Sequence, residues 1–159
     1  DVQLLRGGAP LDVAGRGVFV FDAQAHYRGA SAALRLAEKY GAKVRLATPA
    51  LQPMSALERP NIAPFLRRLS KSGVEVLTSH ELEVVDRKAR IFHLWSDSVY
   101  DLGPEDVLVT VGWTEVDQAL SEALADERPD LPVQIVGDAF APRLMRNAIS
   151  EGFKAGTFA

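Results

Sequence analysis

The chain has 159 residues, of which 47% are hydrophobic and 25% are charged, and its formal net charge is −3. These values are typical of a globular domain, and the Lys and Arg residues are too scattered to form the basic stripe of a nucleic-acid-binding protein. The chain has no cysteine, which excludes disulfides, thiolate nucleophiles and cysteine-bound iron–sulphur clusters within it. Because no apolar run reaches the roughly 20 residues that cross a bilayer, we expect a cytoplasmic protein with neither nucleic-acid nor membrane partners.

Residues 1–16 have the composition of a linker. The chain opens on Asp1 rather than Met, and its lead-in contains Arg6-Gly7-Gly8-Ala9-Pro10. Glycine and proline together disfavour regular secondary structure. We therefore predict an interdomain linker over residues 1–16 and expect the chain to be a fragment of a longer protein.

Residues 17–49 have the hydrophobic pattern of a strand, a helix and a second strand. The run 18–21 is short and apolar, which is typical of a strand buried on both faces. A helix is predicted over 29–40, with small apolar residues on one face and a left-handed stop at Gly41. The second strand covers 44–47, and the handedness of crossover connections makes it parallel to the first.

A second helix and a third strand follow. Asn61 is the expected N-cap of a helix that ends at Gly73. The apolar run 73–77 then predicts a short strand. The order so far is β-α-β-α-β, which is typical of an α/β fold with a parallel sheet.

Alternating runs at 81–85 and 90–95 predict a hairpin. Tyr100 ends a third strand of the same meander, and residues 107–111 form another buried strand. We therefore predict a Rossmann-like, three-layer α/β domain with a β-meander over residues 17–112.

The pattern changes beyond Gly112. Residues 116–124 predict a short helix, and 133–136 predict an apolar strand that ends at Gly137 and Asp138. Pro142 is a favourable first residue for the last helix. We assign residues 113–159 to a separate piece of structure.

The turn after the first strand lacks most glycines of a dinucleotide fingerprint. It reads Asp22-Ala23-Gln24-Ala25-His26-Tyr27-Arg28-Gly29, where G-x-G-x-x-G needs glycine to let backbone N–H groups close on a pyrophosphate. The candidate cofactor-binding residues here are Gly29, Ala30 and Ser31, at the start of the helix. The alternative is a loop that only caps the sheet.

Two further features bear on nucleotide binding by this domain. The second strand ends at Thr48, with no acidic residue to bind a ribose hydroxyl. Arg28 and Arg45 are alternative partners for a 2′-phosphate. We therefore expect little affinity for NADH or NADPH.

A second candidate cofactor site follows the strand 133–136, at Gly137, Asp138 and Ala139. A carboxylate at a strand end can accept hydrogen bonds from sugar or ribityl hydroxyls, and a following helix N-terminus favours an anion. The alternative is a turn aspartate that caps the helix.

The sequence predicts no catalytic residue and no metal site. His26, His80 and His93 are far apart, with no Ser or carboxylate at catalytic or metal-ligand spacing. The chain has no nucleophile elbow, Walker sequence or carboxylate dyad. We interpret these histidines as surface or strand residues.

The order of these pieces resembles the C-terminal region of the trimethylamine dehydrogenase and 2,4-dienoyl-CoA reductase family. The resemblance covers nearly the whole chain and is strongest at residues 61–73, 91–95 and 135–152, the last overlapping the segment VGDAFAPRLMRNAISEGFKAG. In that family an FMN-bearing TIM barrel with a 4Fe-4S cluster precedes two nucleotide-binding-type domains, one inserted in the other.

The resemblance implies a part within a larger flavin-dependent oxidoreductase. Residues 17–112 would be its NAD(P)-type domain and 113–159 the returning C-terminal part of its FAD- or ADP-binding domain, with Asp138 near that cofactor. The lost glycines match the amine dehydrogenase branch better than the NADPH-using reductases. We expect no cofactor and no catalysis in the fragment alone.

The resemblance also implies partners. The upstream barrel and the other half of the FAD/ADP-type domain would cover the last helix, whose Met145 and Ile149 share one face. Without them we expect self-association through residues 131–159. A rival hypothesis is a stand-alone nucleotide-sensing or flavodoxin-like regulatory module, because fold does not determine function.

Overall fold

The computed structural model describes residues 12–86, 88–103, 106–112, 115–143 and 145–158. The chain divides into two compact units, Asp1–Gly112 and Trp113–Ala159, called unit 1 and unit 2 below. Within the described residues, no helix combines the length and apolar character that a membrane span requires.

Unit 1 contains a four-stranded parallel sheet in the order β3-β2-β1-β7. The side chains of its central strand, β1, alternate between the two faces, as pleated strands require. The predicted parallel pairing of the first two strands is confirmed. The strands are β1 (Gly17–Asp22), β2 (Lys43–Thr48), β3 (Glu75–Thr78) and β7 (Val107–Val111).

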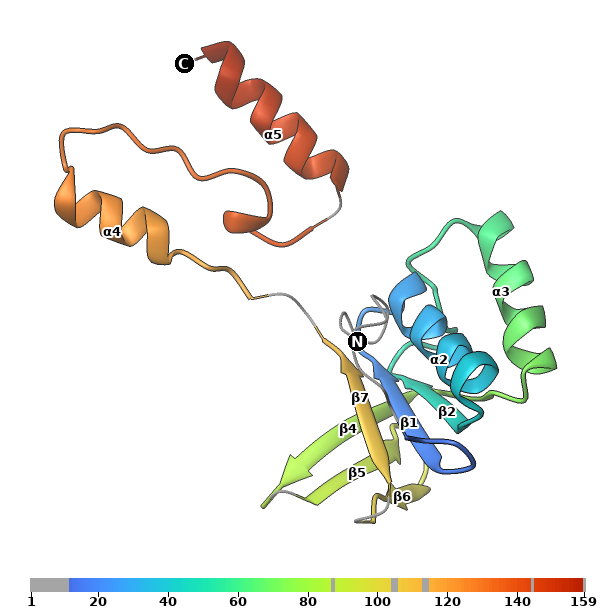
Figure 1. The fold of residues 1–159 in the computed structure, drawn as a ribbon. Coiled ribbons are helices and arrows are strands. Elements are labelled where there is room, and N and C mark those ends of the chain that lie inside the picture. Colours follow the sequence, from blue (N-terminus) through green and yellow to red (C-terminus); the bar gives the residue numbers. More distant parts are fainter. Residues whose placement is uncertain (1–11, 87, 104–105, 113–114, 144, 159) are drawn as a thin grey trace. The chain divides into compact units, whose positions relative to one another are not determined.

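Two helices, α2 (Tyr27–Tyr40) and α3 (Arg59–Lys71), cover one face of this sheet (Figure 1). Val18 and Val20 of β1 share a buried cluster with the small residues of α2, of which Ala30 and Ala33 have no exposed surface. The predicted alanine face of the helix therefore packs on the sheet. Gly41 ends α2 with φ of 64°, the left-handed conformation that glycine adopts without strain.

The antiparallel meander covers the other face (Figure 1) and consists of β4 (His80–Val85), β5 (Lys88–His93) and β6 (Val99–Asp101). Phe19 and Phe21 of β1 point to this side and share a cluster with Ile91 of β5, which is fully buried. Unit 1 therefore has three layers, namely helices, parallel sheet and meander.

One helix start in unit 1 differs from the sequence prediction. The helix expected to start after Asn61 begins at Arg59, because Pro60 in its first turn favours an earlier start. Of the predicted linker 1–16, residues 1–11 lie outside the described residues. Residues 12–16 pack on unit 1: Val13 is 2% exposed in the helix-side cluster, and Lys43 N–H donates to the Arg16 carbonyl at 2.8 Å.

Unit 2 contains α4 (Ala119–Glu127), a short 3-10 turn (Gly137–Ala139) and α5 (Met145–Phe158). The strand predicted over 133–136 is absent from the described residues of this unit. A strand needs a neighbour for its backbone hydrogen bonds, and the described part of unit 2 supplies none. The prediction was therefore wrong for the chain by itself, although Val136 does have extended dihedral angles.

Candidate functional site

The first candidate site lies at the carboxyl edge of the parallel sheet in unit 1. The chain adds β2 and β3 on one side of β1 and β7 on the other. Ligands of open α/β sheets bind beyond the carboxyl ends of the strands, where the strand order reverses in this way. The loop that leaves β1, residues 22–27, is therefore at the edge of the sheet where a nucleotide would bind.

Asp22, the last residue of β1, lies inside this loop and is only 2% exposed. Its Oδ1 accepts a hydrogen bond from the Gln24 N–H at 3.1 Å. Burial raises the pKa of the Asp22 carboxyl above its ordinary value. Backbone hydrogen bonds from Gln24, Ala25 and His26 and the charge of Arg28 oppose that shift and favour the ionised form.

Gly29 is required where it stands because the Asp22 side chain lies against it. A Cβ at position 29 would be 2.4 Å from Asp22 Oδ2 and 2.5 Å from its Cβ and Cγ. If Gly29 is the third glycine of G-x-G-x-x-G, the spacing puts Gln24 and His26 at the first two positions. The third glycine of the fingerprint permits close packing of the helix on the strand. Gly29 keeps this role, whereas the first two glycine positions are not occupied by glycine.

The other residues predicted for this site lie in α2, at the end of β2 and on the meander face of the sheet. In α2, Ala30 and Ser31 lie beyond the first amide groups of the helix, which are the ones without an intrahelical partner. Thr48 is 1% exposed, and its Oγ1 accepts the Ala50 N–H at 3.4 Å. Arg45 stacks over Phe19 at 5.2 Å from the ring centre, on the meander face of the sheet.

The second candidate site, Gly137, Asp138 and Ala139, forms the 3-10 turn of unit 2. Gly137 is buried with φ of 66°, and a Cβ there would be 3.2 Å from the Ala148 Cβ. Asp138 is exposed, and its Oδ1 accepts the Arg143 N–H at 3.4 Å. This bond is to the segment before α5, which begins at Met145, so it does not show helix capping. The exposed Asp138 carboxylate can still accept hydrogen bonds from a ligand.

Glu151 of α5, which the sequence did not single out, holds this turn. Its Oε2 accepts the Gly137 N–H at 2.8 Å, and its Oε1 pairs with the Arg143 guanidinium. The Gly137 hydrogen bond, with a smaller contribution from Arg143, lowers the pKa of the Glu151 carboxyl. The pairing joins residues 14 apart on a helix and a turn, so no local motif announces it.

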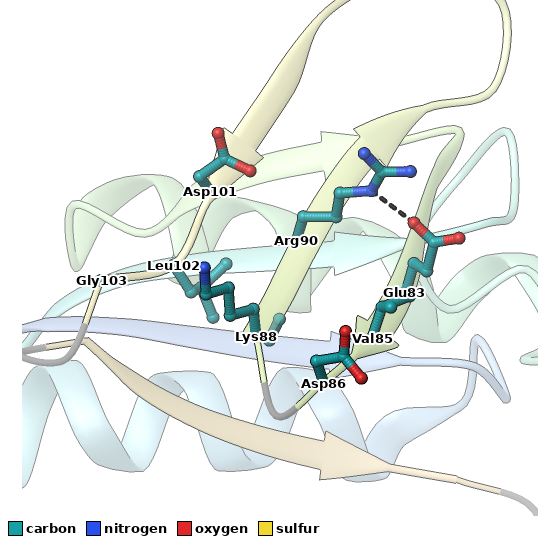
Figure 2. Close-up of a pocket in the computed structure, with 9 residues that line it drawn as sticks. Glu83, Val85, Asp86, Lys88, Arg90, Asp101, Leu102 and Gly103 are labelled. Carbon is teal, nitrogen blue, oxygen red and sulfur yellow. Dashed lines mark hydrogen bonds and ion pairs between the residues drawn. The ribbon is translucent and has the colours of Figure 1, made fainter.

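An open pocket of about 870 Å³ lies beside the meander (Figure 2). Arg90 and Glu83, which line it, form an ion pair with each other. Gly103, also in its wall, precedes β7, so the pocket lies at the amino edge of the parallel sheet. Ligands of such sheets bind at the opposite edge, and we do not assign the pocket a function.

The structure brings together two histidines that the sequence left apart. His80 and His93 are opposite each other in the β4–β5 hairpin, with ring centres 4.9 Å apart. His80 is 7% exposed, and its Nδ1 donates to the Thr78 carbonyl at 2.7 Å. His93 Nδ1 accepts the Trp95 N–H at 3.2 Å. These bonds hold the edge of the meander, and the short turn after Val85 was the signal that could have predicted the pairing.

Across the described ranges, no group of three or more His, Asp or Glu side chains could hold a metal ion. A comparison with protein-family models and one with curated proteins gave no match.

Solved structures of oxidoreductases share the fold. Histamine dehydrogenase from Rhizobium sp. 4-9 aligns with a TM-score of 0.83 and 22% identity over 97% of this chain and 24% of its own. The 6-hydroxypseudooxynicotine amine oxidase of Pseudomonas geniculata N1 aligns with a TM-score of 0.77 and 22% identity, over 98% and 23%. A 2-naphthoyl-CoA reductase aligns with a TM-score of 0.70 and 24% identity, over 98% and 22%.

These likenesses establish the fold, and all three proteins are oxidoreductases by name. The chain spans about a quarter of the length of each.

Proposed function

We propose that this chain is the nucleotide-binding-type part of a multidomain flavin-dependent oxidoreductase of the amine dehydrogenase or NADH:flavin oxidoreductase kind. It supplies scaffold and not the catalytic barrel. The observation that carries the proposal is the alignment of 97% of the chain, across both units, with one histamine dehydrogenase. Unit 1 would be the NAD(P)-type domain and unit 2 the C-terminal part of an FAD- or ADP-binding domain.

In the parent enzyme, Gly137 and Asp138 would contact the FAD or ADP. The residues present fit such a group: Gly137 lets the backbone turn tightly, and the exposed Asp138 carboxylate can accept hydrogen bonds from sugar hydroxyls. Glu151 fixes the turn from behind through the Gly137 N–H. The FMN and 4Fe-4S cluster of the parent would lie in its barrel, which supplies the redox chemistry.

The exposed apolar surface of unit 2 supports the proposal that another part of the parent enzyme covers it. Met145, Ile149 and Phe153 follow one another at four-residue intervals along α5 and are 79%, 63% and 73% exposed. Leu120 of α4 is 75% exposed as well. The three exposed apolar side chains along α5 mark a surface that another structure covers, and we assign it to the other half of the FAD/ADP-type domain.

The genomic sequence upstream of the Asp1 codon tests the proposal. An open reading frame that encodes a TIM barrel and a cluster of cysteines, continuous with this chain, is the expected result. A start codon next to Asp1 would instead favour the stand-alone nucleotide-sensing or flavodoxin-like module. In parallel, the purified chain should be colourless and inactive with amines and enoyl thioesters, and turnover without an added barrel would contradict the proposal.

A further inference from the structure

The turn between β5 and β6 is held by a histidine side chain. The His93 Nδ1 accepts the backbone N–H of Trp95 at 3.2 Å and lies 3.0 Å from the Ser96 hydroxyl. A backbone N–H can only donate, so the His93 Nδ1 must carry its lone pair. Neutral His93 therefore has its proton on Nε2, and the turn requires this tautomer.

Protonation of His93 affects its two partners differently. A charged imidazole carries a proton on both nitrogens and has no acceptor left. The Ser96 hydroxyl can rotate and accept a hydrogen bond from the new Nδ1–H. The Trp95 N–H cannot reverse its role, so it loses its partner and faces another N–H group. The peptide between Leu94 and Trp95 must then turn away from the ring.

This turn is tied to the carboxyl edge of the parallel sheet. Leu94 N–H donates to the Ser79 carbonyl at 2.7 Å, and Ser79 N–H donates to the Ala50 carbonyl, in the loop after β2, at 3.0 Å. Trp95, the next residue, is 74% exposed. With most of its ring in solvent, its position depends on the backbone of the turn and not on packing in the core. The hydrogen bond to His93 therefore positions an exposed aromatic side chain at this edge.

The titratable and charged groups near the His93 ring include a second histidine. His80, opposite His93 on β4, has its ring centre 4.9 Å away and is 7% exposed. Its Nδ1 donates to the Thr78 carbonyl at 2.7 Å, and a second proton on Nε2 leaves that bond in place. His80 therefore does not release the turn directly. Further groups are Tyr100 of β6, 5.9 Å from the His80 ring, Arg45 of β2, 5.5 Å from the Tyr100 ring, Glu75 of β3, which pairs with Arg45 at 2.8 Å, and the exposed Asp97 of the turn.

We propose that the β5–β6 turn is a pH-sensitive element of unit 1: neutral His93 holds the backbone at Trp95, and protonation of His93 releases it. Histidine is the side chain whose ordinary change of charge falls between about pH 5 and 8, so the turn responds to modest acidification. Release changes how Leu94 and Trp95 are presented at the carboxyl edge of the sheet. The inference goes beyond the proposed function and does not depend on it, because all of these residues lie in unit 1.

The test is a pH titration of the full chain followed by NMR, from about pH 7.5 to about pH 5. At the upper end, the ring nitrogen resonances of His93 should report the Nε2–H tautomer. As the pH falls, the Trp95 amide resonance should shift together with the His93 ring. Its protection from hydrogen exchange, corrected for the intrinsic pH dependence of exchange, should fall about fivefold, as expected for the loss of one hydrogen bond.

His93→Asn supplies the main comparison. An asparagine side chain can accept a backbone N–H two residues on and does not titrate, so the protection of the Trp95 amide should change less than about twofold over the same range. His26→Asn is the matched control, since it removes a histidine from the start of α2 instead. The titration at Trp95 should persist in this control.

Three outcomes would overturn the proposal. They are the Nδ1–H tautomer in neutral His93, a Trp95 amide that follows His80 or does not titrate, and a loss of protection that persists in folded His93→Asn. The first two are measured on the unmodified chain, so they decide the matter even if the variant does not fold. None of them bears on the sequence upstream of Asp1, so the proposed function can fail separately.

Discussion

Substitution of Gly29 by alanine should destabilise unit 1, although alanine favours helices. The added methyl would be 2.4–2.5 Å from three atoms of Asp22, whereas carbon atoms pack best at about 3.5–4.0 Å. One of these atoms is the Asp22 Cβ, which cannot move without the backbone of β1. Overpacking costs about 1–3 kcal/mol, and the contact with the Asp22 Cβ puts this site in the upper part of that range, at about 2–3 kcal/mol. The helix propensity of alanine returns about 1 kcal/mol. We expect a net loss of about 1–2 kcal/mol.

A double-mutant cycle identifies the cause of this loss. Asp22→Gly removes all three contacting atoms, so Gly29→Ala in that background should no longer destabilise, with a coupling of about 2 kcal/mol. Asp22→Ala keeps the Cβ at 2.5 Å and should relieve the loss only in part. Gly152→Ala, followed through the amide resonances of α5, is the control for helix propensity alone, because no atom beyond its own helix backbone and chain neighbours lies within 4 Å of the added Cβ.

Urea titration, followed through the amide resonances of β1 and β2, measures the free energy of unfolding of unit 1 separately from unit 2. The reasoning is refuted if Gly29→Ala is as stable as the unmodified protein. It is refuted equally if Asp22→Gly and Asp22→Ala restore stability to the same extent, because the contact with the Asp22 Cβ would then carry no cost.

Three further outcomes are expected. Burial raises the pKa of Asp22 in the folded state. The contribution of this group to the free energy of unfolding is therefore greatest below its ordinary pKa of 3.8 and is lost as the pH rises through the folded value. In urea titrations at several pH values, Asp22→Asn should lack this fall in stability. The Arg68 hydrogen bond, with that of Ser72, lowers the pKa of Glu38 to about 2, so stability is lost as the pH falls from 4.5 towards 2. Glu38→Gln should flatten that small decline, and an unchanged curve would contradict it. The isolated chain should self-associate through α5 in size-exclusion chromatography, and Ile149→Lys should restore the monomer; a monomer at all concentrations, with α5 as protected from hydrogen exchange as β1, would contradict this.

The sequence alone predicted the elements whose patterns are local. The apolar run of β1, the alanine face of α2 and the glycine that ends α2 follow from hydrophobic period and backbone freedom, and these elements were confirmed. The alternating runs of the meander were predicted for the same reason. The strand predicted at 133–136 was wrong because strand formation is not local. An apolar run forms a strand only where another strand accepts its hydrogen bonds.

The sequence also showed that the fingerprint glycines are missing, but only the tertiary structure decided what replaces them. In the printed sequence, Asp22 is one acidic residue at a strand end, and its direction depends on the left-handed turn at Ala25 and on the ties of the loop to β7 and Ala56. Glu151 likewise becomes a partner of Gly137 only when α5 folds back on the turn. Hydrophobic period reports which face of an element is buried, whereas these contacts depend on the path of the backbone between elements, which sequence period does not encode.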